Sequence, residues 1–476
     1  MSPEEAGAAA PIRREPGWRD LLAGANLVRS LALAGGAGLH ATNLYVSTTI
    51  LPSVVRDIGG LAYYAWNTTV FVVASILGSA VASRLLARLG ARAAYAIAAA
   101  IFAAGSLLCA AAPAMATMLV GRFVQGLGGG LLLALPYALI RTTFAEPLWP
   151  RAMALFSGVW GIATLLGPTI GGIFAELGNW RAAFWSLAPA TAALTLAAVF
   201  VLPRRKGGAP APPLPGRQLA LLTAAVLAAS ASSVAGRSAW SAGGLLLAVT
   251  LVAAVITAES RARHRLLPRG AFRITKPLGA LYLMSALLAM TVTCTEIFVP
   301  LFLQELRGLS PLEAGYLAAL MSVGWTVGAI VTSSLHEGRL ILVLRGAALL
   351  SVVSMAALAV LLPGQGGGGW VALTPLCIAR VAGGAGVGIA YPHLSASILR
   401  VAPADEAEIA GSSIMTVQLC ATAFGASLAG VTVNLAGLGD GPEGVAGAAR
   451  WLFVVFALGP ALCLMIAWGW RQPAER

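Results

Sequence analysis

The sequence predicts an all-α polytopic membrane protein that crosses the bilayer fourteen times. Of its 476 residues, 58% are hydrophobic and only 10% are charged, and the mean hydropathy is +0.84. A soluble domain of this length cannot hide so much apolar surface. The apolar residues also fall into separate stretches of about 20 residues or more, the length that a helix needs to span a bilayer.

The fourteen predicted helices follow one another with mostly short connections. Their extents are 29–54, 64–83, 93–112, 115–140, 152–175, 182–202, 217–236, 239–258, 278–303, 312–334, 340–362, 369–398, 409–435 and 449–470. The seventh and eighth are the weakest, because small polar residues dilute the seventh and the turn between the two is short. Without this pair the protein would have twelve helices.

Basic residues gather in the connections on one side of the predicted bundle. They are Arg13, Arg14, Arg19, Arg84, Arg88, Arg92, Arg141, Arg151, Arg204, Arg205, Lys206, Arg261, Arg263, Arg265, Arg269, Arg273 and Lys276. The opposite connections carry only Arg56, Arg181, Arg237, Arg307 and Arg450. The positive-inside rule therefore predicts a multi-pass protein of the cell (inner) membrane with both termini in the cytoplasm. This placement accounts for the net charge of +13 without nucleic acid as a partner.

An internal repeat indicates two related halves. The segment RFVQGLGGG begins at Arg122, and RVAGGAGVG begins at Arg380. The glycines align as well, Gly126 with Gly384, Gly128 with Gly386 and Gly130 with Gly388. Parallel repeats of six helices are typical of one large group of secondary transporters, which bind substrate near the midplane between the halves.

The repeat and the composition together predict the domain organisation. A cytoplasmic tail (1–28) precedes an N-terminal six-helix bundle (29–203), and a linker with two inserted membrane helices (204–276) leads to a C-terminal six-helix bundle (277–471) and a short cytoplasmic tail (472–476). The first part of the linker is rich in proline and glycine.

The fifth predicted helix contains features that are unusual for a membrane anchor. Pro168 lacks the N–H of a regular helix and favours a kink. Ala163, Gly167 and Gly171 recur every fourth residue and form a smooth stripe that a neighbouring helix can approach closely. The pattern fits helices that rock against one another, and it also fits static close packing.

No pattern for catalysis or for a metal or cofactor is present. The five cysteines lie singly in apolar stretches, without metal-ligand spacing, and we interpret them as packing residues. No glycine-rich loop is followed by Lys-Ser/Thr, which argues against an ATP-driven pump. We therefore expect neither an enzyme nor a bound cofactor.

Several motifs resemble those of the major facilitator superfamily, and specifically its fourteen-helix drug:proton antiporters. The motif of that family's fourth helix is similar to Arg122, Gln125, Gly126 and Gly128. Its fifth-helix antiporter motif appears as Gly167, Pro168, Gly171 and Gly172, with Ala163 for the first glycine, and it is followed by Trp180, Arg181 and Phe184. The segment ILPSVVRDIGG, with Trp66 shortly after it, resembles the family's first connection. The resemblance implies the major facilitator fold and antiport.

Two departures weaken a mechanism taken directly from that family. The loop between its second and third helices normally contains an aspartate, whose position is Ala87 here, and Ser83 replaces a glycine, whereas Arg88, Gly90 and Arg92 remain. An aspartate is also frequent in its first helix, where this chain has Asn43, which cannot carry a proton. The resemblance still implies a conformational switch built from Arg88, Gly90, Arg92, Gly167, Pro168, Gly171 and Gly172.

Glu296 is the carboxylate that falls clearly inside a predicted helix, and an ionisable group there is expected to be functional. We predict that Glu296 couples transport to protons, together with Arg122 and His40, with His393 as another histidine inside the bundle. The side chains predicted to contact substrate are Asn43, Trp66, Asn67, Tyr391 and Gln418. For these five, hydrogen bonding between helices is an equally good interpretation.

The sequence favours a secondary active transporter, an exporter of small amphipathic organic compounds or drugs that is driven by an ion gradient. Its expected partners are the substrate, a proton or other coupling ion and the lipid bilayer, and the expected state is a monomer. An uptake carrier or uniporter of the same fold is an alternative, favoured by the missing aspartates. A membrane sensor or scaffold without transport activity is an alternative of another class.

Overall fold

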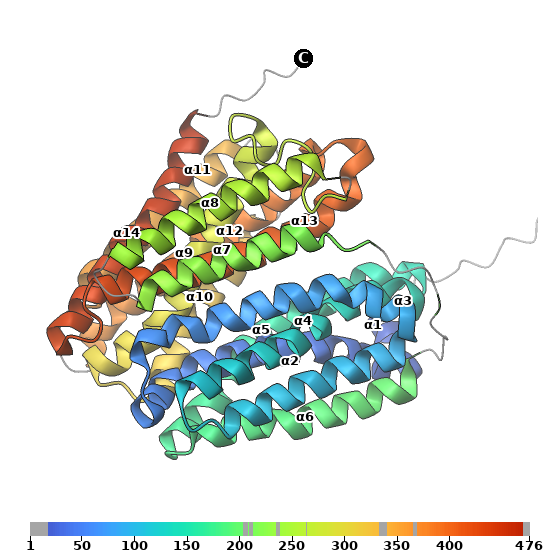
Figure 1. Ribbon diagram of the computed structural model, residues 1–476, viewed down its shortest axis with the longest axis horizontal. Coiled ribbons are helices and arrows are strands. Elements are labelled where there is room, and N and C mark those ends of the chain that lie inside the picture. Colours follow the sequence, from blue (N-terminus) through green and yellow to red (C-terminus); the bar gives the residue numbers. More distant parts are fainter. Residues whose placement is uncertain are drawn as a thin grey trace, which may run out of the picture.

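The computed structural model describes residues 18–202, 208, 213–234, 239–262, 264–332, 340–364 and 369–469, and these residues form helices and no strands (Figure 1). The tail 472–476, most of the tail 1–28 and much of the linker 203–217 lie outside the described residues. The elements are α1 (Trp18–Leu21), α2 (Gly24–Ile58), η1 (Leu61–Tyr63), α3 (Tyr64–Ala110), α4 (Met115–Thr143), η2 (Glu146–Leu148), α5 (Trp149–Glu176), α6 (Trp180–Val201), α7 (Gly216–Val234), α8 (Ala239–Arg261), α9 (Pro277–Arg307), α10 (Pro311–Thr332), α11 (Leu340–Leu361), α12 (Trp370–Val401), η4 (Ala404–Glu406), α13 (Ala407–Leu435) and α14 (Gly441–Gly469).

The predicted all-α polytopic fold is confirmed. Twelve helices in the described part of the chain are long and apolar enough to cross a membrane. One of the twelve contains α3, whose 47 residues are far more than one crossing needs. The 35-residue α2 is not among the twelve, because its centre contains many polar residues, but it packs inside the bundle. With α2 included and α3 counted as two crossings, the described residues contain the fourteen predicted segments.

The structure differs from the prediction at the connection between the second and third segments. Residues 84–92 are helical, and the only break is at Gly90, with φ 79° and ψ 170°. Side chains with a Cβ rarely adopt this backbone conformation, so glycine is required there. Element α3 therefore consists of two helices that meet in a kink at Gly90, so the connection between the two predicted segments is shorter than expected.

The helices form two bundles (Figure 1). Helices α2 to α6, blue to green, make up one, and α9 to α14, yellow to red, make up the other. They meet where α2 contacts α9, α5 contacts α10 and α3 contacts α13. The two inserted helices are both present: α7 packs on α8 and α13, with a smaller contact to α3.

The aligned glycines of the repeat occupy equivalent places in the two bundles. A methyl group at Gly130 of α4 would collide with the carbonyl oxygen of Ser75 on α3. A methyl group at Gly388 of α12 would likewise collide with the carbonyl oxygen of Trp325 on α10. Both pairs of helices therefore approach until their backbones touch, as small residues allow in membrane bundles.

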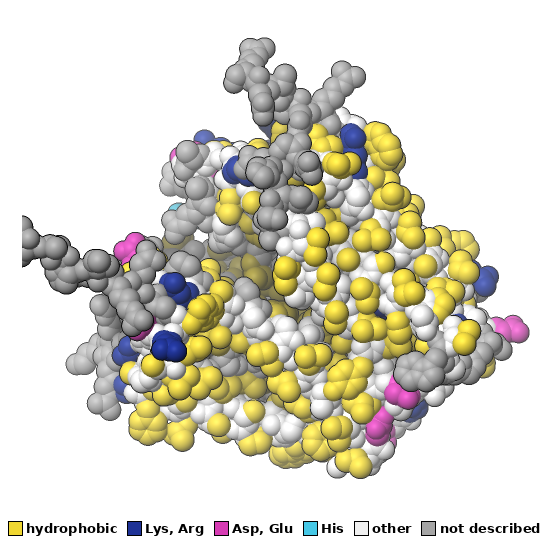
Figure 2. Space-filling model, turned by 180° about the vertical axis from the view of Figure 1, so that it is seen from behind, with side chains coloured by type: hydrophobic (Ala, Val, Ile, Leu, Met, Phe, Trp, Pro, Cys, Tyr) yellow, Lys and Arg dark blue, Asp and Glu magenta, His cyan; other side chains and the backbone are white. Residues whose placement is uncertain are grey.

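The surface of the molecule suits a bilayer. Figure 2 shows hydrophobic side chains over the middle of one face, with most charged side chains near its margins. Large apolar residues such as Phe200, Val360 and Val371 are more than 70% exposed. Exposed apolar area of this extent indicates contact with lipid.

Candidate substrate cavity between the two bundles

A cavity of about 450 Å³ lies between the two bundles and is lined by both of them. From the first bundle it receives His40 and Tyr45 of α2 and Trp160 of α5, and from the second Glu296 of α9, Trp325 of α10 and Gln418 of α13. Its wall combines aromatic rings, hydroxyl groups and one carboxylate. This is the composition of a site for a small organic molecule.

Glu296 links the two bundles inside the cavity. The hydroxyl of Tyr45 donates a hydrogen bond of 3.3 Å to Oε1 of Glu296. Arg380 of α12 lies near enough to interact electrostatically with the same carboxylate. One acidic group therefore has a hydrogen-bond donor from the opposite bundle and a cation from its own.

The two arginines of the repeat have different surroundings. Arg380 donates to the carbonyl oxygen of Ala318 and lies close to Glu296. Arg122 is fully buried; it donates to the Asn67 carbonyl oxygen at 3.2 Å and to Oε1 of Gln125 at 2.6 Å. Neither arginine forms an ion pair within the described residues, and no described carboxylate is an electrostatic partner of Arg122. The carboxylate that accompanies the arginine of the second bundle thus has no counterpart in the first.

Asn43 is another buried polar residue of the first bundle. It is fully buried, and neither side-chain polar atom has a hydrogen-bond partner within the described residues. One helical turn later on α2, Ser47 donates to Oδ1 of Asn67 at 2.8 Å. Asn43 and Asn67 therefore lie inside the first bundle and are not part of the cavity wall.

The cavity wall contains two of the predicted coupling residues and one of the predicted substrate residues. Glu296 and His40 line it, and the imidazole of His40 lies 5.2 Å from the ring of Phe71 and 6.1 Å from that of Trp160. Arg122 is behind it, with its guanidinium 4.2 Å from the same Phe71 ring. Of the five predicted substrate residues, Gln418 lines the cavity.

Tyr391 and Trp66 lie outside the wall. The ring of Tyr391 packs on Trp325 at 5.3 Å, so it supports a residue of the wall. Trp66 faces the inserted helix α7, and its Nε1 donates to the Ser230 carbonyl oxygen at 3.0 Å. The tyrosine and tryptophan residues that do line the cavity, Tyr45, Tyr137, Trp160 and Trp325, were not singled out from the sequence. The one available signal was the position of Trp160 within the glycine-rich segment of the kinked helix.

We expect Trp66→Phe to destabilise the protein while leaving substrate affinity unchanged. The substitution removes the hydrogen bond to Ser230, which is worth about 1 kcal/mol. The readouts are the thermal unfolding midpoint and the substrate affinity of the purified protein. Trp185→Phe is the matched control, because Trp185 is 54% exposed on α6. A large loss of affinity with an unchanged midpoint would instead assign Trp66 to substrate contact.

The predicted switch residues on α5 lie against two different partners. A Cβ at Gly167 would overlap Cβ of Tyr45 on α2, and one at Gly171 would lie 3.0 Å from the Val46 carbonyl oxygen. A Cβ at Gly172 would instead lie 2.6 Å from Cα of Leu312 on α10, and Pro168 packs near Gly315 of the same helix. Helix α5 is thus wedged between its own bundle and the opposite one.

The other switch residues surround the break in α3. Arg92 donates through Nε to the carbonyl oxygen of Leu202 at 2.6 Å, and so ties α3 to the end of α6, where a cation is favourable. Arg88 is exposed, and no described carboxylate forms an ion pair with it. Gly90 provides the turn between these two arginines.

Contacts between the bundles concentrate at the end opposite to this turn. Arg56 of α2 forms an ion pair with Glu305 of α9 at 3.0 Å, and Thr169 and Tyr316 share a hydrogen bond of 2.5 Å. Nδ2 of Asn434 donates to the Ala62 carbonyl oxygen at 2.9 Å. At the end that contains Arg88, the described residues form no ion pair between the bundles. The structure is therefore closed at one end.

A second ion pair at the closed end stays within the first bundle. Nη1 of Arg181 donates to Oδ2 of Asp57 at 2.5 Å, and Nε1 of Trp180 donates to the same oxygen at 3.0 Å. These hydrogen bonds hold the pKa of Asp57 below its usual value. They fasten the start of α6 to the end of α2, from which Arg56 reaches the opposite bundle.

Comparison with known proteins decides the family. The pattern of the Major Facilitator Superfamily matches residues 33–374. The chain belongs to the major facilitator superfamily. It is 39% identical over 454 residues to a probable multidrug-efflux transporter of Mycobacterium tuberculosis, covering 93% of each chain. It is also 27% identical to the methylenomycin A resistance protein of Streptomyces coelicolor, over 88% of this chain and 87% of that one.

Solved structures agree with the fold of this major facilitator protein. A peptide transporter crystallised with sulfate superimposes with a TM-score of 0.70 over 95% of this chain and 96% of that one, at 14% identity. A nucleoside transporter superimposes with a TM-score of 0.61 over 93% and 99%, at 16% identity. The resemblance to the superfamily that the motifs predicted is confirmed, and its members are transporters and not enzymes.

Proposed function

We propose that this protein is a secondary active exporter of small amphipathic organic compounds, driven by protons that compete with substrate at the central cavity. The observation that carries the proposal is the cavity between the bundles, which contains a carboxylate among aromatic rings. The relatives whose names refer to multidrug efflux and antibiotic resistance support export and this class of substrate.

The shape and chemistry of the cavity favour an amphipathic ligand. A volume of about 450 Å³ fits a molecule of drug size. Trp160 and Trp325 offer apolar ring surface, while Glu296, Thr293 and Gln418 offer polar groups. The carboxylate of Glu296 also favours ligands that bear a positive charge or a hydrogen-bond donor.

Alternating access follows from the uneven contact between the bundles. In the proposed topology the contacts of Arg56 with Glu305 and of Gly172 with Leu312 lie at the outer end, so this conformation is closed to the outside. Rocking of one bundle against the other would separate these contacts and close the inner end. The two bundles would move relative to each other about helix α5, because it packs against both of them.

Glu296 is proposed to exchange a proton for substrate. The ionised carboxylate attracts Arg380 and accepts the hydrogen bond from Tyr45, whereas protonation removes the charge and weakens both interactions. Since Tyr45 belongs to the opposite bundle, the charge of Glu296 and the relative position of the bundles are coupled. His40, on the same wall, is the second candidate for a proton.

The topology part of the proposal places both termini in the cytoplasm, in the cell membrane, with the monomer as the working unit and the domain limits as predicted. We expect a cysteine at Thr275 to react with a membrane-impermeant reagent only from the cytoplasmic side. A cysteine at Gly439, in the turn between α13 and α14, should react only from outside; both positions are exposed. Labelling of Thr275→Cys in intact cells would refute this orientation.

Transport into inverted vesicles tests the function. Labelled amphipathic cations should accumulate in vesicles that contain the protein when a proton gradient is imposed, and should not do so without the gradient. Equilibration of substrate with no response to the gradient would favour a uniporter. This is the main competing function, because Asn43 and Ala87 stand where the related antiporters have aspartates. No movement of any compound would favour a sensor or scaffold.

A further inference from the structure

A second cavity, of about 720 Å³, lies away from the substrate cavity, where the connector between α8 and α9 meets the end of α12. It is bordered by Glu259 and Ser260 of α8, the connector from Arg265 to Lys276, the start of α9, and Val401 and Pro403. In the proposed topology this is the cytoplasmic surface of the membrane. Nothing in the transport mechanism uses it.

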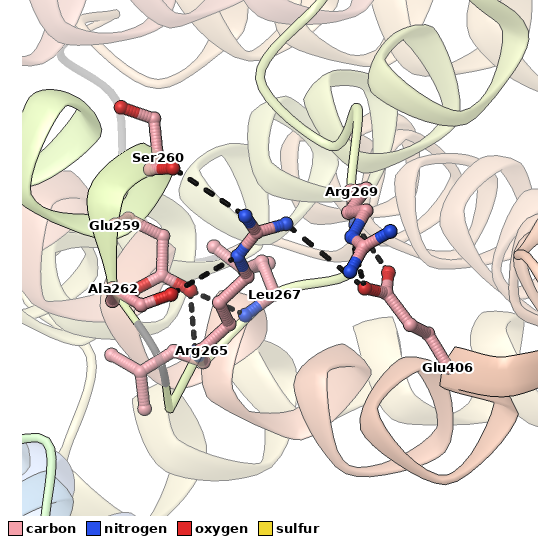
Figure 3. Close-up of polar contacts among 8 residues, drawn as sticks. Glu259, Ser260, Ala262, Arg265, Leu267, Arg269 and Glu406 are labelled. Atoms are coloured by element: carbon pink, nitrogen blue, oxygen red, sulfur yellow. Dashed lines mark hydrogen bonds and ion pairs between the residues drawn. The ribbon is translucent and has the colours of Figure 1, made fainter.

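Two buried carboxylates hold the connector in a fixed shape (Figure 3). Oε1 of Glu259 accepts the backbone N–H groups of Leu266 and of Leu267, the latter at 2.8 Å. Glu406 of η4 accepts the backbone N–H of Arg269 and pairs with its Nε at 3.0 Å. Glu259 is 3% exposed and Glu406 6%. These interactions therefore fix the shape of the cavity border before any ligand binds.

The cations of this cavity are only partly neutralised. Arg265 and Arg269 share Glu406, and the Arg269 side chain is still 69% exposed. Arg273 and Lys276 are exposed and form no ion pair within the described residues. Four cations therefore lie beside two carboxylates, which leaves an excess of positive charge. The remaining positive charge suits an anion.

Apolar groups stand directly beside these cations. Ile256, Leu267, Phe272 and Val401 line the same cavity. Phe272 is 41% exposed and Ile274 64% exposed, so the connector offers apolar side chains next to Arg273 and Lys276. A free anion would use the cations alone, whereas a lipid would place its phosphate on them and its chains on the apolar residues.

We propose that this cavity, the connector pocket, binds the phosphate-bearing headgroup of an anionic lipid of the inner leaflet. Arg273 and Lys276 would hold the phosphate, with Arg269 as a third donor, and Phe272 would contact the acyl chains. Bound lipid would fasten the connector, and with it the inserted helix α8, to the second bundle.

Native mass spectrometry of the intact protein, titrated with phosphatidylglycerol, tests the proposal. The double variant Arg273→Gln/Lys276→Gln should bind this lipid at least about tenfold more weakly than the unmodified protein, since both cations that would hold the phosphate are lost. The control Arg217→Gln/Arg261→Gln removes the same charge from exposed arginines outside the pocket and should bind normally. Thermal unfolding without lipid should be the same for both variants.

Phosphatidylcholine and inorganic phosphate identify the source of the anion. Phosphatidylcholine should bind weakly and equally to all three proteins, and inorganic phosphate should compete poorly. Equal loss of phosphatidylglycerol binding in both double variants would overturn the proposal, because it would indicate a general charge effect. Inorganic phosphate that displaces the lipid at equal concentration would overturn the assignment to a lipid. If the double variant proves unstable, Lys276→Gln alone gives the same comparison.

Discussion

We expect Glu296→Gln to abolish substrate transport driven by a pH gradient while leaving the protein folded and able to bind a neutral substrate. Glutamine keeps nearly the same volume and can still accept the hydrogen bond of Tyr45. It cannot take up or release a proton, so both halves of the cycle would see the same charge state. The measurement is gradient-driven uptake in proteoliposomes, which should fall to the level of protein-free vesicles.

The control for this variant lies on the same helix. Glu305→Gln also removes a negative charge from α9, but Glu305 pairs with Arg56 at the closed end and lies outside the cavity. Its transport should remain coupled to the gradient, even if the rate changes. If Glu296→Gln transports substrate at the unmodified rate under a proton gradient, Glu296 serves only as a hydrogen-bonding residue. His40 would then be the next candidate for the proton-coupling site.

A further variant separates the proton from the contact between the bundles. Tyr45→Phe removes the hydrogen bond to Glu296 and keeps the carboxylate. If the hydrogen bond only links the charge of Glu296 to the position of the first bundle, transport by this variant should still depend on the proton gradient but proceed at a lower rate. Loss of coupling equal to that of Glu296→Gln would show that the pair acts as one unit.

The second large effect is expected on α5. Leucine at Gly167 would drive its side chain into Tyr45 of α2, and overpacking of this kind costs about 1–3 kcal/mol or more. Transport should fall about tenfold or more, because close-packed helices cannot deform smoothly to accept the added atoms. Gly171→Leu should behave in the same way, since Gly171 faces α2 as well. Transport is measured in vesicles, with the amount of protein in the membrane determined in parallel.

Gly172→Leu should act differently from these two variants. Gly172 touches Leu312 of the opposite bundle, so a larger side chain should separate the bundles at the closed end. We expect a cysteine at Thr169 to be labelled faster from outside in this variant than in a protein that retains Gly172. Unchanged labelling would mean that the contact between α5 and α10 does not hold the closed state.

Gly158 provides the matched control on the same helix. A Cβ at this position has no neighbouring atom within 4 Å. Gly158→Leu should therefore reach the membrane and transport at close to the normal rate. If it is as defective as Gly167→Leu, the loss reflects leucine in α5 generally, and the role assigned to the glycine stripe is wrong.

The sequence by itself determined the class, the fold and the two-part plan of this protein. Length and spacing of apolar stretches are local properties, and only a helix satisfies its own backbone in lipid, so the all-α fold follows directly. The repeat around Arg122 and Arg380 can be recognised directly in the amino-acid sequence. Glu296 also stands out from the sequence alone, because an ionisable residue is rare in the middle of an apolar helix.

The tertiary structure decided which side chains meet. Lipid is as apolar as the protein interior, so hydrophobic periodicity does not tell the cavity face of a membrane helix from its lipid face. For this reason the sequence could not separate Tyr45 and Trp325, which line the cavity, from Asn67, which does not. It could not show that Trp66 is turned toward the inserted helix α7, or that α3 bends at Gly90 alone. These outcomes depend on how the helices are rotated against one another, and only the packing between them fixes that rotation.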